Sequence, residues 1–144
     1  MYKFLLSLLL TLTACKGKSD CEGESFDGEL AFSSDGAGSA SGTLKWAEGI
    51  DEGLMIEIGV QSEDGTSYYG ALSKGGLFDF PETCGTELDF RIDQIDAGPF
   101  QVLARIQEAG GAGDTGEIEY QAEGLSEVFD VSGGDVSGLV VNLE

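Results

Sequence analysis

The chain has 144 residues and a formal net charge of −20, from 27 Asp and Glu against 7 Lys and Arg. Such an acidic chain disfavours nucleic-acid binding, which depends on Lys and Arg neutralising phosphates. The sequence contains no His, which excludes His-ligated zinc, His-dependent triads and the commonest general base, so we predict no enzyme. Hydrophobic residues make up 41% of the chain and recur regularly, which opposes disorder.

The N-terminus has the organisation of a secretory signal. Lys3 precedes an apolar run from Phe4 to Leu12. This run is too short for a transmembrane helix, which needs about 20 apolar residues. We therefore predict that residues 1–14 form a removable signal peptide.

The segment Leu12-Thr13-Ala14-Cys15 resembles the lipobox of bacterial lipoproteins. The resemblance implies that the Cys15 thiol carries diacylglycerol, the only covalent cofactor expected, and that Cys15 becomes the first mature residue. Two or three acyl chains would then hold the protein on the membrane. Lys16 replaces the Asp that retains such proteins at the inner membrane, which favours the outer membrane of a Gram-negative cell envelope, facing the periplasm or the surface. The alternative is ordinary secretion with Cys15 as a plain thiol.

Two further cysteines, Cys21 and Cys84, remain once Cys15 is lipidated. In an oxidising compartment an even number of cysteines favours a disulfide, and the alternative is two free thiols. A bridge would leave no thiolate for nucleophilic catalysis. Residues 15–21 are thus interpreted as the lipidated Cys and a short tether.

Residues 22–144 are predicted to form one all-β domain, because apolar and polar residues alternate with a period of two. Such alternation is typical of sheets with one buried face. It places Trp46 and Tyr68 in the core and leaves Tyr69 outside, which argues against an aromatic sugar-binding platform. The alternating stretches are 26–32, 40–46, 54–60, 68–72, 88–92, 118–122, 128–131 and 139–143.

Residues 99–110 are ambiguous. Pro99 in a first turn and Gly110 at the end would suit a helix. However, Phe100, Val102, Ala104 and Ile106 also alternate with polar or larger neighbours. We predict a strand, since the neighbouring segments are strands.

From Leu88 to Leu143 the chain resembles transthyretin-like (prealbumin-like) domains related to carboxypeptidase regulatory modules. The similarity is carried by 88–95 followed by Asp96-Ala-Gly-Pro-Phe-Gln-Val-Leu-Ala104, and by the ending 131–143. It implies an Ig-like/prealbumin-like two-sheet sandwich of seven or eight mostly antiparallel strands. Such modules are structural or binding units, so the resemblance implies no catalytic residues.

The function predicted from these observations is a non-catalytic, membrane-anchored envelope lipoprotein that binds a protein, a glycan or a cation. The alternative is a calcium-dependent binding or adhesion module using loop 108–117. That loop offers only Glu108, Asp114 and Glu117. Calcium takes six to eight oxygens, so a solvated turn is favoured and no metal ligand is assigned.

Overall fold

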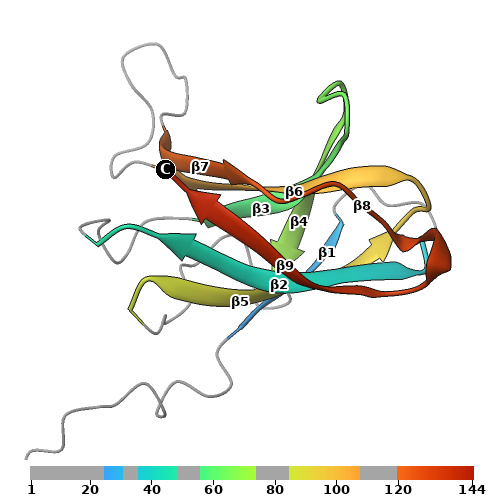
Figure 1. Cartoon of the computed structure of the whole chain (residues 1–144), viewed down its shortest axis with the longest axis horizontal. Coiled ribbons are helices and arrows are strands. Elements are labelled where there is room, and N and C mark those ends of the chain that lie inside the picture. Colours follow the sequence, from blue (N-terminus) through green and yellow to red (C-terminus); the bar gives the residue numbers. More distant parts are fainter. Residues whose placement is uncertain (1–24, 31–35, 49–55, 74–84, 108–119) are drawn as a thin grey trace, which may run out of the picture.

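The computed structural model describes residues 25–30, 36–48, 56–73, 85–107 and 120–144. They form an all-β domain, which confirms the all-β part of the predicted fold (Figure 1). The strands are β1 (Ser25–Leu30), β2 (Gly38–Trp46), β3 (Ile56–Ser62), β4 (Tyr68–Ser73), β5 (Glu87–Ile95), β6 (Pro99–Gln107), β7 (Tyr120–Leu125), β8 (Phe129–Asp130) and β9 (Val136–Leu143), with a 3-10 turn at Val131–Gly133.

Strand β6 resolves the ambiguous segment in favour of a strand. It is hydrogen-bonded to β3 on one side and to β7 and β8 on the other. Val102, Ala104 and Ile106 are fully buried at alternating positions. The period-two pattern and the strands on both sides therefore outweigh the helix-like ends of this segment.

The described strands are connected in the order β7-β6-β3-β4-β1-β5-β2-β9, with β8 beside β6. The nine strands exceed the seven or eight implied by the resemblance, because β8 is a separate two-residue strand. Two pairs, β1 with β5 and β2 with β9, are parallel. In Figure 1 β7, β6 and β3 lie above β5 and β2, and β4 runs between these layers.

The two ends of this sheet approach each other. The backbone N–H of Glu123 in β7 donates to the Glu144 carbonyl at 3.2 Å, and the Glu144 N–H donates back at 3.1 Å. Gly124 lies beside this contact, and a Cβ added there would overlap the Asn142 carbonyl oxygen. The strand ends can approach this closely because residue 124 has no side chain.

The core lies between the layers and takes one face of each main strand. Ile58, Val60, Ile92, Val102 and Val141 are completely buried. Burying a side chain of this size stabilises a fold by about 1.5–3 kcal/mol relative to exposing it. Trp46 is also in the core, as the alternation predicted, and is 8% exposed.

The hairpin between β3 and β4 is closed around the Asp64 carboxylate. Asp64 Oδ1 accepts hydrogen bonds from the Ser62 hydroxyl at 2.6 Å, the Thr66 hydroxyl at 2.7 Å and the Thr66 N–H at 3.0 Å. These donors, led by the Ser62 hydroxyl, lower the pKa of Asp64 from 3.8 to about 2. Gly65, with a φ of 69°, supplies the left-handed residue of the turn.

Ser62→Ala is expected to raise the pKa of Asp64 toward 3.8, because the largest cause of its depression is removed. The measurement is a pH titration of the Asp64 side-chain carboxyl by NMR. The lowered pKa of Asp64 also predicts how folding stability depends on pH. The carboxylate stabilises the native state above pH 4, and this contribution is lost as pH falls through about 2. Ser137→Ala, on β9, is the matched control. An Asp64 titration midpoint that does not move in Ser62→Ala would contradict the assignment.

Candidate functional site

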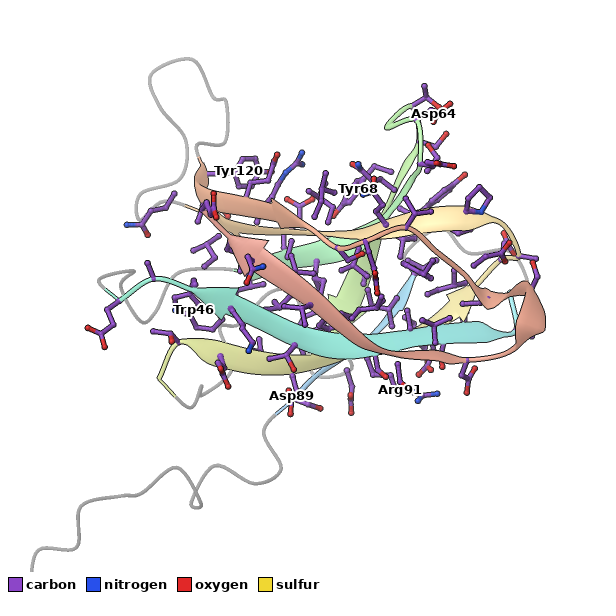
Figure 2. The ribbon with its side chains drawn as sticks, in the orientation of Figure 1. Trp46, Asp64, Tyr68, Asp89, Arg91 and Tyr120 are labelled. Atoms are coloured by element: carbon purple, nitrogen blue, oxygen red, sulfur yellow. The ribbon has the colours of Figure 1, made fainter. Side chains whose placement is uncertain are left out.

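The outer side of β4, β3, β6 and β7 carries an aromatic and arginine cluster that the sequence pattern did not predict. We name it the Tyr–Arg face and define it by Tyr68, Leu103, Arg105, Tyr120 and Leu125. Figure 2 shows Tyr68 and Tyr120 on this outer side, away from Asp89 and Arg91 on the opposite side.

Tyr120 reaches this face through an irregularity in the pairing of β6 with β7. Ile106 lies opposite Ala122, but the next β6 residue, Gln107, lies opposite Tyr120. One step on β6 therefore matches two on β7, as in a β-bulge, and bulges redirect side chains. Simple alternation put Tyr120 on the same face as the buried Ala122, which is wrong, because the bulge turns Tyr120 outward.

Tyr68 also lies on this outer face, which corrects the prediction that it is a core residue. Ala71 is fully buried and Tyr69 packs against the core, so β4 presents the opposite alternation to the one expected. The Tyr68 ring covers Gly59, where an added Cβ would lie 2.9 Å from the ring. The glycine at position 59 thus leaves room for a tyrosine to lie flat on the sheet.

Arg105 lies between the two tyrosines. Its guanidinium carbon is 4.9 Å from the centre of the Tyr120 ring and 5.8 Å from that of Tyr68, which is within the range of cation–π contacts. Its Nε donates to Glu123 at 2.5 Å. Burial lowers the pKa of Arg105, but the Glu123 and Glu57 carboxylates outweigh this and the net pKa is raised. Arg105 therefore stays charged and fixed in place.

The carboxylate of Glu57 completes the cluster. It accepts a hydrogen bond from the Tyr120 hydroxyl at 2.8 Å. The Tyr68 hydroxyl is buried and close to the same carboxylate but does not reach hydrogen-bonding geometry. Burial, followed by the influence of Glu57, raises the pKa of both tyrosines above the ordinary value. Both phenols are consequently neutral across the physiological range.

Leu103 and Leu125 add an apolar centre to the face. They lie opposite each other on β6 and β7. Leu103 is only 3% exposed although it points away from the main core cluster, whereas Leu125 is 44% exposed. Val128, three residues further along the chain, is 45% exposed. Leu125 therefore exposes apolar surface next to the covered Leu103.

The opposite outer side, on β5 and β2, is polar and internally paired. Asp89 accepts from the Thr43 hydroxyl at 2.9 Å. Arg91 lies 2.8 Å from Asp93 and 3.8 Å from Asp135. These exposed ion pairs contribute little, about 0–1 kcal/mol each. We assign no site there.

The lipidation, disulfide and metal candidates of the sequence lie outside the described residues. This applies to the lipidation residue Cys15, to Cys21 and Cys84, and to the loop 108–117, so each of these stays a prediction. Within the described ranges no three acidic or sulfur side chains gather as a metal site. No helix among these residues is long and apolar enough to cross a membrane.

The doublet Tyr68-Tyr69 was the available signal for the missed face. Neighbouring residues of a strand point to opposite sides, so one of the two must lie on the outer side. The bulge at Tyr120 has no comparable sequence signal.

Comparisons with known proteins add no relative: no family model matches the chain, and neither a curated protein nor a solved structure is similar to it. What the geometry defines is an all-β domain with a preorganised aromatic and arginine face.

Proposed function

We propose that the protein is a non-catalytic binding module, lipid-anchored in a bacterial cell envelope, that uses the Tyr–Arg face to hold its ligand. The observation that carries the binding function is the stacking of Arg105 between Tyr68 and Tyr120 on the outer side of the sheet. Outer faces of sheets are commonly polar, and an aromatic and arginine cluster there needs another explanation.

The chemistry of the face suits recognition more than catalysis. Tyr and Arg are enriched in protein interfaces and among the few residues whose truncation strongly weakens binding. Here the side chains are held in advance, since Glu123 holds Arg105 and Glu57 holds Tyr120. Side chains fixed before binding lose less conformational entropy when the ligand arrives.

The anchor is proposed from the sequence Leu12-Thr13-Ala14-Cys15. The proposal also includes a disulfide between Cys21 and Cys84 and a location at the outer membrane. A further part of the proposal is that the domain is similar in shape to prealbumin-like two-sheet sandwiches. The layered arrangement of strands in Figure 1 supports this. The membrane is then a partner through the lipid alone.

Cys15→Ser is expected to abolish lipid attachment and release the protein from membranes, because a Ser hydroxyl does not replace the thiol that carries diacylglycerol. The test is metabolic labelling with a radioactive fatty acid, followed by fractionation of the envelope. Ser19→Ala, in the tether, is the control and is expected to remain labelled and membrane-bound. If the Cys15→Ser protein still partitions with detergent-extracted membranes, the anchor proposal is wrong.

A further inference from the structure

The Tyr–Arg face has a chemistry that restricts what can bind it. We propose that its occupant is a basic segment of a partner protein, with Lys or Arg side chains on either side of apolar ones. This rests on the proposed function and names the ligand class of the same face. Three features of the protein favour such a ligand, namely the apolar centre of the face, its charged surroundings and the charge of the whole chain.

The apolar centre calls for apolar side chains in the partner. Leu125 and Val128 expose 44% and 45% of their surface at the end of β7 and just after it. Tyr120, which is 36% exposed, lies at the other end of β7, opposite Gln107. Leu125 lies opposite the covered Leu103 on the neighbouring strand. This end of the face therefore offers apolar surface, and exposed apolar surface on a domain marks interaction sites.

The charges around this patch are acidic. Glu57, Glu123 and Glu127 come from β3, β7 and the residues after β7. Among the described residues of β3, β4, β6 and β7 the one cation is Arg105, and Glu123 already pairs with it. Lys or Arg in a partner would meet carboxylates here, whereas Asp or Glu would meet repulsion.

The net charge of −20 removes two competing occupants. A second copy of the chain would bring like charge against like charge. An anionic glycan would meet the same repulsion. A cationic protein segment is the occupant that satisfies both the apolar centre and the acidic surroundings.

The experiment selects ligands without assuming the answer. A displayed library of random peptides is panned on the full-length lipoprotein in detergent, and the affinity of the selected peptides is measured by calorimetry. The expected peptides are rich in Lys or Arg with interspersed apolar residues. Leu125→Ser is expected to weaken them about tenfold, the effect of removing a central interface side chain. Val140→Ser, at a side chain of equal exposure (43%) on β9, is the matched control and should change nothing.

Other outcomes overturn the proposal in distinguishable ways. Neutral or acidic peptides that lose affinity with Leu125→Ser would show that the face binds but that the ligand class is wrong. Malto-oligosaccharides that shift the NMR signals of Tyr120 and Leu125 would lead to the same conclusion. No enrichment, or equal loss in Leu125→Ser and Val140→Ser, would reject the face as a binding site. None of these results affects the test of the anchor by Cys15→Ser.

Discussion

Gly124→Ala is expected to destabilise the domain by about 3 kcal/mol, because inserting a methyl group into a packed site costs roughly 1–3 kcal/mol or more. The added Cβ would overlap the Asn142 carbonyl oxygen, which belongs to the backbone and has no side-chain freedom to move away. The overlap lies next to the hydrogen bonds between Glu123 and Glu144, so the contact of β7 with β9 is expected to open. The melting temperature should fall by about 10 °C.

The matched control is Gly133→Ala in the 3-10 turn. A Cβ there meets nothing within 4 Å, and Gly133 does not adopt a positive φ. Its stability should therefore stay within about 0.5 kcal/mol of the parent chain. Denaturant unfolding of both variants provides the measurement. Equal stability of Gly124→Ala and Gly133→Ala would show that β7 and β9 do not approach as closely as described.

Ser126→Ala is the second substitution with a large expected effect. The Ser126 hydroxyl oxygen accepts from the Val102 N–H at 2.8 Å and its proton is donated to the Glu127 carbonyl at 2.7 Å. Both Ser126 (4% exposed) and Val102 are buried. The alanine variant leaves the Val102 N–H without a partner, which costs about 1–3 kcal/mol.

This loss can be measured in two ways. Denaturant unfolding gives the change in stability, and hydrogen exchange of the Val102 amide should accelerate. Ser137→Ala, at an exposed serine of β9, is the control and should have little effect. If Val102 exchange is unchanged in Ser126→Ala, the hydroxyl is not its hydrogen-bond partner. Because Ser126 directly follows Leu125, the substitution is also expected to disturb that end of the Tyr–Arg face.

Most of the strands could be predicted from the sequence because apolar and polar residues alternate along them. Leu88, Phe90 and Ile92 in β5 illustrate this, since all three are buried. Alternation also correctly favoured a strand at 99–107. The order in which the strands pair could not be predicted in this way. Alternation with a period of two indicates which side of a strand is buried, but not which other strand lies beside that strand.

The Tyr–Arg face was missed for two local reasons. At β4 the two tyrosines are adjacent in the sequence. The prediction placed Tyr68 on the inner side of the sheet and Tyr69 on the outer side, which is the reverse of their positions. At β7 the bulge opposite Ile106 and Gln107 changed the alternation within the strand. Both errors arise from a shift of one residue, which is enough to move a side chain from the core to the outer surface.

The pairing of β1 and β2 has a consequence for when the chain can fold. β1 is placed between β4 and β5, and β2 between β5 and β9, the last strand. Neither of the first two strands has a neighbour that precedes it in the chain, so both wait for strands made later. Folds dominated by such distant contacts form slowly. Native pairing of β2 is therefore completed only after β9 has been synthesised, and a chain cut short before β9 would leave one edge of β2 unpaired.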